Sequence, residues 1–212
     1  MSESAEYHLP AGGRAALSEA LFRIGALRLG RFTLEDGKTS SYSLDIGVVP
    51  SDPEAYALSV AAYLAVLEGM GESSYDALAG AGTAGVMFSS PVAYQLKRPM
   101  LQVRGDDAHR KQEQVEGAVR PGWRTVLLGG VIDTAESLAS AVESLRRAGC
   151  VVMEAVVLVD RLEGGRARLR GAGVTLNAFT DIRNLAETLY ERKKITKAGL
   201  QSVLRQVEGS GR

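Results

Sequence analysis

The sequence predicts an α/β fold in which a mostly parallel sheet is covered by helices on both faces. Short apolar segments alternate with helical patterns from about residue 75 onward, which is the arrangement that favours parallel strands. Residues 151–160, "VVMEAVVLVD", form an apolar run of the kind found in strands buried on both faces. The chain has 212 residues, of which 45% are hydrophobic, so it is long enough to bury a core as one domain.

The first 30 residues predict a loose tail and a helix. Residues 1–13 are mostly small and polar, and they carry no apolar periodicity. From residue 14 to residue 30, apolar side chains that include Leu17, Leu21 and Ile24 recur at helical spacing. We therefore expect a helix that ends at about Gly30.

A hairpin and a second helix are expected next. Residues 31–50 alternate in two short segments around Asp36 and Gly37, a pair that favours a tight turn between strands. Asp52 and Pro53 suit the N-cap and the first position of a helix that continues to about residue 71.

The remaining chain alternates regularly. Strands are predicted at residues 75–82, 99–104, 124–130, 151–160 and 174–179, and helices at residues 84–97, 134–148, 181–194 and 196–209, with a short helix or loop at 164–173. Ligands of such sheets bind at the carboxyl ends of the strands. The loops after residues 80, 130 and 160 are therefore the candidate site.

The composition excludes several classes of function. The 25 basic and 25 acidic residues cancel, which makes a nucleic-acid partner unlikely, and no apolar run is long enough to suggest a membrane span. Cys150 is the only cysteine, so no intramolecular disulfide can form; we expect a buried thiol and a cytoplasmic protein. His8 and His109 are too few for a histidine metal site, and no metal is expected on protein side chains.

Three loops could carry chemistry, and each has a plainer interpretation. The segment "AGAGTAG", residues 79–85, could bring backbone N–H groups to an anion, or could be a tight turn that needs glycine for its geometry. Residues 104–117 could form a lid or a solvated surface excursion. Arg161 follows Asp160 at a strand end, where it could bind a carboxylate or phosphate or could form a surface ion pair.

Taken together, these segments resemble the orotate phosphoribosyltransferase family. The segments "FTLEDGKTSSYSLDIG", "ALAGAGTAGV", "PMLQVR", "VLLGGVIDTAES" and "VVLVDRLEGG" occur in the family's order and near its spacing. The resemblance implies a type I phosphoribosyltransferase fold with a Rossmann-like sheet and a small hood. It also implies transfer of phosphoribose from phosphoribosyl diphosphate (PRPP) to orotate, with Mg²⁺ entering through PRPP, in a homodimer whose lid loops reach across.

That fold divides the single domain into regions. We expect a tail at 1–13, the hood and first helix at 14–50, the α/β core at 51–190 and a C-terminal helix at 191–212.

Part of the family's substrate-binding set is retained. Thr83, Ala84 and Gly85 match the diphosphate loop, and Arg104 matches an arginine that contacts the diphosphate. Arg161 matches the arginine that holds orotate.

The PRPP signature itself departs from the family. Gly129 and Gly130 stand where two adjacent acids bind the ribose hydroxyls. The phosphate loop, Thr-Thr-Gly-x-Ser in the family, here consists of five residues of which two are acidic: Asp133, Thr134, Ala135, Glu136 and Ser137. Carboxylates oppose a phosphate at a helix N-terminus. Asp133 as N-cap with Glu136 three residues later has the spacing of a capping box, so we expect a self-capped helix.

The lid and the hood also differ from the family pattern. Gly105 follows Arg104 where the family has a lysine, and His109, Arg110 and Lys111 are the remaining candidates for the lid. Glu35 lies where the family places lysine or a small polar residue near orotate, so its charge would repel the substrate.

We therefore expect a member of this family whose catalysis is impaired or lost. The alternative is a non-catalytic nucleotide-sensing regulator or structural partner on the same fold, which would need no Mg²⁺. A DNA-binding regulator is the weaker version, because one basic amphipathic helix at residues 191–209 more often packs against the protein.

Overall fold

The structure is a computed structural model that describes residues 12–33, 37, 39–104 and 115–210. Within those residues, the central sheet has six strands in the order β5-β4-β3-β6-β7-β8. The neighbouring pairs are parallel except for β4 with β5. The strands are β3 (Ala77–Ala81), β4 (Met100–Val103), β5 (Val115–Glu116), β6 (Arg124–Ile132), β7 (Val151–Asp160) and β8 (Thr175–Asp181). The short antiparallel β5 was not predicted.

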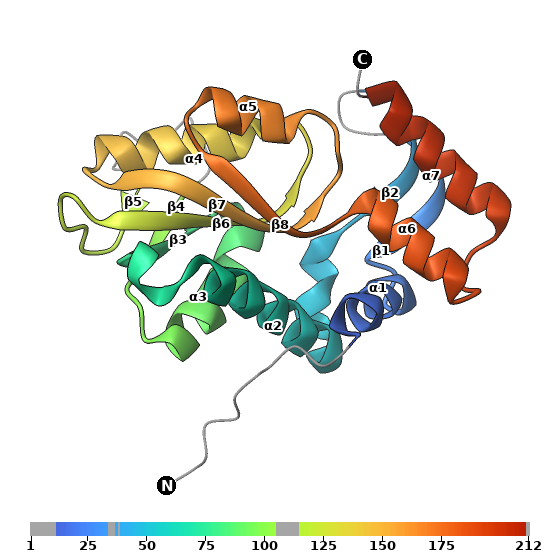
Figure 1. Cartoon of the computed structure of the whole chain (residues 1–212), viewed down its shortest axis with the longest axis horizontal. Coiled ribbons are helices and arrows are strands. Elements are labelled where there is room, and N and C mark those ends of the chain that lie inside the picture. Colours follow the sequence, from blue (N-terminus) through green and yellow to red (C-terminus); the bar gives the residue numbers. More distant parts are fainter. Residues whose placement is uncertain (1–11, 34–36, 38, 105–114, 211–212) are drawn as a thin grey trace, which may run out of the picture.

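Helices cover both faces of this sheet, as the sequence predicted (Figure 1). Two of them, α2 (Pro53–Met70) and α3 (Gly82–Leu96), lie on one face, while α4 (Glu136–Arg147) and α5 (Gly165–Gly171) lie on the other. Alternate residues along a strand point to opposite faces. In β6, Leu128 accordingly belongs to the core under α2 and α3, whereas Leu127 belongs to the core under α4.

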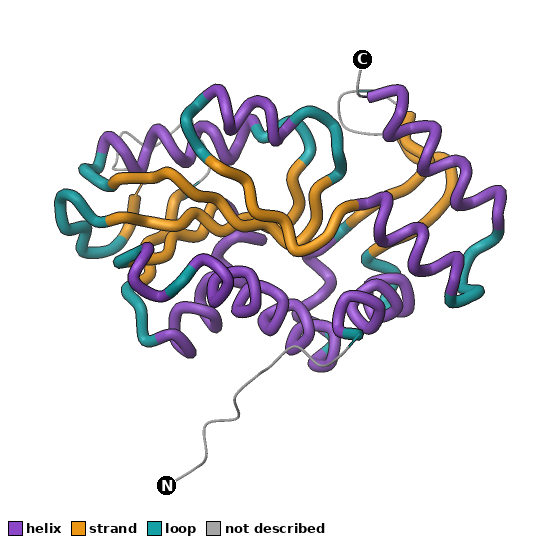
Figure 2. Tube along the Cα trace, in the orientation of Figure 1, coloured by secondary structure: helices purple, strands orange, loops and turns teal. Residues whose placement is uncertain are grey.

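A second, two-stranded sheet lies apart from the first (Figure 2). Its strands β1 (Leu27–Thr33) and β2 (Thr39–Leu44) are antiparallel, which confirms the expected hairpin. The first helix, however, is shorter than predicted: α1 (Gly13–Arg23) stops before Gly25, whose φ is 74°. Leu27 and Leu29 continue the apolar spacing but belong to β1.

The predicted start of the second helix is confirmed. The Asp52 side chain accepts a hydrogen bond of 2.9 Å from the backbone N–H of Ala55, and Pro53 is the first helical residue. The 3₁₀ turns η1 (Ile46–Ser51) and η2 (Glu72–Ser74) flank this helix.

The chain ends in two helices that cover the hood hairpin and α1. These are α6 (Ile182–Glu191) and α7 (Lys197–Ser210). Val203 and Val207 of α7 are buried in the core shared with α1 and α2. The basic C-terminal helix is thus packed against the protein, as its plainer interpretation required.

Two further features are the buried cysteine and the length of the apolar helices. Cys150 is a buried free thiol, as expected. None of the helices within the described ranges is both long and apolar enough to cross a membrane.

Candidate functional site

A cleft of about 600 Å³ opens at the carboxyl ends of β3, β4 and β6. Two of the three loops predicted to form the site, those after β3 and β6, line it, whereas the loop after Asp160 does not. Its lining includes Thr83 and Ala84 from the start of α3, Arg104 after β4, and Glu136 and Ser137 from the start of α4. The parallel topology therefore brings together three segments that the sequence had singled out separately.

The loop between β3 and α3 is held by close packing of glycine. A Cβ on Gly85 would lie 2.6 Å from the carbonyl oxygen of Leu128, so the helix can approach the sheet only because this residue has no side chain. No side chain caps the N-terminus of α3 at Ala81, and Gly82 has a φ of 61°. The plainer interpretation of "AGAGTAG", a turn that needs glycine, therefore holds. The segment also lines the cleft, and its binding of an anion stays a prediction.

The floor of the cleft is apolar where two acids would bind ribose. Gly129 and Gly130 are both buried in β6. A Cβ on Gly129 would lie 2.9 Å from Cδ2 of Leu138, and one on Gly130 would lie 3.0 Å from Cβ of Ala84 and 3.1 Å from Cγ2 of Ile46. Neighbouring apolar side chains occupy the space beside each glycine.

The strand that carries this glycine pair is anchored to α2 by a hydrogen bond. The hydroxyl of Tyr63 in α2 donates a hydrogen bond of 2.6 Å to the carbonyl oxygen of Gly129. Burial raises the pKa of the Tyr63 phenol, so this group remains a donor at any ordinary pH.

The predicted capping box at α4 is wrong. The helix begins at Glu136 with Ala135 as its N-cap, and no side chain caps it. Because β6 continues to Ile132, Asp133 lies three residues before the first helical residue and cannot reach the helical N–H groups. Its Oδ1 instead accepts a hydrogen bond from the neighbouring N–H of Thr134. Both Asp133 and Thr134 are exposed.

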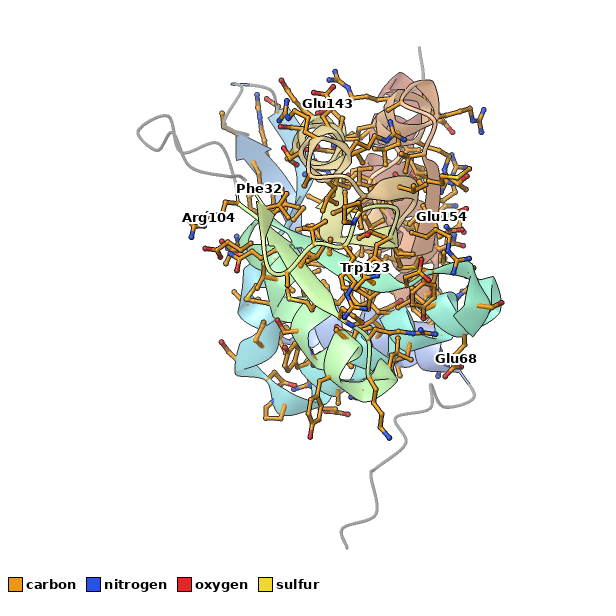
Figure 3. The ribbon with its side chains drawn as sticks, turned by 90° about the vertical axis from the view of Figure 1, so that its left-hand side faces the viewer. Phe32, Glu68, Arg104, Trp123, Glu143 and Glu154 are labelled. Atoms are coloured by element: carbon orange, nitrogen blue, oxygen red, sulfur yellow. The ribbon has the colours of Figure 1, made fainter. Side chains whose placement is uncertain are left out.

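Arg104 is already paired. Its guanidinium forms an ion pair with Glu116 of β5. Figure 3 shows the Arg104 side chain projecting from the molecular surface. The other lid candidates, Gly105, His109, Arg110 and Lys111, lie outside the described residues, as does Glu35 in the hood.

Arg161 forms an ion pair, as one of its two interpretations held, but the pair is buried and does not lie on the surface. The residue is 8% exposed, and its Nη2 lies 3.1 Å from Oε1 of Glu163. The guanidinium also lies over the ring of Tyr42 in β2, 4.9 Å from the centroid. The neighbouring Asp160 is buried as well, and its Oδ2 lies 3.3 Å from Nη2 of Arg166.

Glu163 is the centre of a network that sequence reasoning missed. Its Oε1 accepts hydrogen bonds from the hydroxyl of Tyr42, at 3.2 Å, and from Nε2 of Gln206 in α7, also at 3.2 Å. Burial, with a further contribution from the negative charge of Glu163, raises the pKa of the Tyr42 phenol, although Arg161 opposes the shift. Glu163 follows Arg161 by two residues, which was a usable signal, but nothing local pointed to Gln206.

No family model matches the sequence. Curated proteins do match: the chain is 34% identical over 199 residues to the orotate phosphoribosyltransferase of Cenarchaeum symbiosum, covering 92% of this chain and 96% of that protein. It is 33% identical over 186 residues to the protein of the same name from Pyrobaculum aerophilum, covering 87% and 94%.

Solved structures are similar too. Orotate phosphoribosyltransferase from Aeropyrum pernix has a TM-score of 0.74 and 31% identity, covering 82% of this chain and 98% of that one. UMP synthase from Leishmania donovani has a TM-score of 0.83 and 27% identity, covering 94% of this chain but only 43% of the synthase. An adenine phosphoribosyltransferase from Rhodothermus marinus, 23% identical with a TM-score of 0.61, shares the fold. These matches confirm the fold implied by the resemblance.

Proposed function

This chain belongs to the orotate phosphoribosyltransferase family of pyrimidine nucleotide biosynthesis, and we propose that its catalysis of the family's reaction is impaired or lost. The nominal reaction joins orotate and PRPP to give orotidine 5′-monophosphate and diphosphate. The observation that carries the proposal is the floor of the cleft, where Gly129 and Gly130 offer no carboxylate and apolar side chains fill the adjoining space.

The acids matter because the reaction depends on positioning. Phosphoribosyl transfer needs the ribose held in line with the incoming base, and well-oriented binding groups supply much of the rate. A glycine cannot accept a hydrogen bond from a ribose hydroxyl through a side chain that it lacks. Removing one preorganised contact typically costs about 100- to 1,000-fold in rate.

The charge of the cleft also opposes PRPP. Glu136 lies in the first turn of α4 and lines the cleft, so its carboxylate competes with a phosphate for the positive end of the helix dipole. Arg104 adds no unpaired positive charge, because Glu116 neutralises it. On the described lining of the cleft, a polyanionic substrate therefore meets one carboxylate and one arginine whose charge is already neutralised.

The residues do not fit a protein-held metal ion. The described part of the chain contains no group of three or more acidic, histidine or cysteine side chains that could hold one. Glu136 is the one carboxylate on the described lining of the cleft, whereas Mg²⁺ prefers six oxygen ligands. If PRPP binds, Mg²⁺ enters with it as part of the substrate.

The alternative is a non-catalytic nucleotide-sensing regulator or a structural partner. The specific observation in its favour is the Arg161–Glu163 network, which remains well organised although the floor of the cleft has changed. A homodimer and a cytoplasmic location also stand as proposals.

Orotate turnover with PRPP and Mg²⁺ tests the proposal. We expect no turnover by the wild type. Because a side chain at residue 129 would meet Leu138, the acids should be restored in G129D/G130D/L138A as well as in G129D/G130D. The triple variant should gain at least about 100-fold over a size-matched control, G129N/G130N/L138A, which lacks the charges.

Wild-type turnover that the restored acids do not raise would refute the proposal. Equal rates for the aspartate and asparagine triple variants would show that the missing acids are not what limits the reaction. Circular dichroism of each variant establishes that it is folded.

A further inference from the structure

The described lining of the cleft carries one carboxylate and no unpaired cation. Glu136, at the start of α4, lines the cleft and is exposed, whereas the guanidinium of Arg104 pairs with Glu116. The other polar side chains on this lining are the hydroxyls of Thr83, Ser137 and Ser140. The described side chains therefore offer a ligand negative charge and hydroxyl groups, but no surplus positive charge.

Two helix N-termini offset part of this negative charge. Both α3 and α4 begin at the cleft, and no side chain caps either of them. Each N-terminus carries about half a positive charge, so the two together roughly balance the carboxylate of Glu136. A phosphate monoester carries a charge of about −1.5 to −2 at pH 7. It would leave water for this cleft without meeting a compensating charge, which is unfavourable.

The walls of the cleft suit an uncharged ring. Apolar side chains of Ile46, Val103, Leu138 and Ala141 line it, and its volume of about 600 Å³ is that of a small-molecule site. Burying the face of a planar base against these side chains is favourable, because apolar surface leaves water on both sides of the contact. A neutral base therefore gains what a charged group would lose here.

The chemistry of Glu136 also favours hydroxyl groups on the ligand. A carboxylate only accepts hydrogen bonds, so a ligand that satisfies it must bring donors. A nucleoside brings its ribose hydroxyls, including the one at the 5′ position, whereas a nucleotide carries its phosphate there.

We propose that the cleft binds pyrimidine nucleosides in preference to their 5′-phosphates, and that Glu136 sets this preference. The inference rests on the proposed function for the choice of a pyrimidine, and on the charge of the cleft for the exclusion of phosphate.

Uridine and uridine 5′-monophosphate differ only in the phosphate and provide the test. Isothermal titration of the wild type in about 10 mM salt, where the Debye length is about 30 Å, should show uridine binding at least about fivefold more tightly. In Glu136→Gln, which keeps the size of the side chain but removes the charge and adds a donor, the preference should fall at least about fivefold or reverse.

Glu143→Gln is the matched control. Glu143 lies seven residues later on the same helix, about 10.5 Å further along its axis, and is exposed but outside the lining of the cleft (Figure 3). Its loss should leave the ratio of the two affinities nearly unchanged. An equal fall in the two variants would overturn the role of Glu136.

The wild-type ratio needs no variant, so an unstable Glu136→Gln would not protect the inference from refutation. Equal affinities, tighter binding of the nucleotide, or binding of neither ligand by the wild type would overturn the inference. None of these results would overturn the proposed function, because the turnover of orotate by the wild type and the restored variants decides that separately.

Discussion

Ala135 adopts a backbone conformation that suits glycine. Its φ is 61° and its ψ is 21°, in the left-handed region, and it joins β6 to α4 beside the cleft. The family resemblance places glycine, which readily adopts this conformation, at this position. Residues other than glycine, asparagine and aspartate are disfavoured there because their Cβ crowds the following carbonyl oxygen.

Ala135→Gly should therefore stabilise the protein by about 1 kcal/mol, with the greater freedom of glycine in the unfolded chain offsetting part of the relief. Urea unfolding measures the change. Ala148→Gly at the other end of the same helix is the control, because Ala148 has a φ of −75° and should gain nothing. A lower stability for Ala135→Gly would show that the left-handed turn is not strained.

At the scale of one residue, the sequence showed which side chains are present but not where the helix begins. The absence of carboxylates at residues 129 and 130 could be seen directly, and so could the acids at residues 133 and 136. The position of the helix start could not, because a strand that continues to residue 132 moves Asp133 out of the N-cap. A capping box depends both on the three-residue spacing and on which residue is the N-cap. The sequence showed the spacing but not the N-cap.

Two parallel strands are tied together at their amino ends by one ion pair. Asp76, just before β3, accepts hydrogen bonds from both the backbone N–H and the side chain of Arg124, the first residue of β6. The Arg124 guanidinium also donates to the carbonyl oxygen of Ser73. Hydrogen bonds from the side chain and the backbone of Arg124 lower the pKa of Asp76 from 3.8 to about 2.

This pair should contribute stability in a defined pH window. Since the pKa of Asp76 is lower in the folded state, the contribution is present above about pH 4 and is lost as the pH falls from about 4 to about 2. The difference in unfolding free energy between the wild type and Asp76→Asn should accordingly shrink across that window. Urea unfolding at several pH values measures it.

Arg124→Gln removes the guanidinium but keeps the backbone hydrogen bond to Asp76. Adding Asp76→Asn to Arg124→Gln should therefore give a smaller pH-dependent difference in unfolding free energy than adding it to the wild type. If the difference in unfolding free energy between the wild type and Asp76→Asn stays constant down to about pH 2, the lowered pKa of Asp76 is contradicted.

At the scale of elements, the predicted end of the first helix failed for a physical reason. Leu27 lies three residues after Ile24, a separation that suits one face of a helix, and Leu27 and Leu29 equally suit alternation in a strand. Gly25 decides between them, because its left-handed φ of 74° ends the helix. A glycine just after a run of helical residues was thus the available signal.

At the scale of the whole molecule, the alternation of strands and helices was enough to predict a parallel sheet covered on both faces. The spatial order of the strands and the short antiparallel β5 depend on long-range pairing, which no local pattern contains. The same limit applies to the site. Glu163 contacts Tyr42 and Gln206 across separations of 121 and 43 residues, so this network becomes visible only in the folded chain.

The weak PRPP binding that the proposed function predicts should be visible in the stability of the whole protein. A ligand that binds only the folded state raises its stability by RT ln(1 + [L]/Kd), so 1 mM ligand with a dissociation constant above about 1 mM adds less than about 0.4 kcal/mol. For a chain of this size that corresponds to a shift of less than about 2 °C in Tm. We expect a shift this small when PRPP and Mg²⁺ are added, because Glu136 and the apolar floor of the cleft oppose the substrate. Differential scanning fluorimetry measures the shift, and diphosphate with Mg²⁺ controls for general effects of anions. A specific rise of several degrees would mean that the cleft still holds PRPP without its acids, and impaired catalysis would then have to arise after binding.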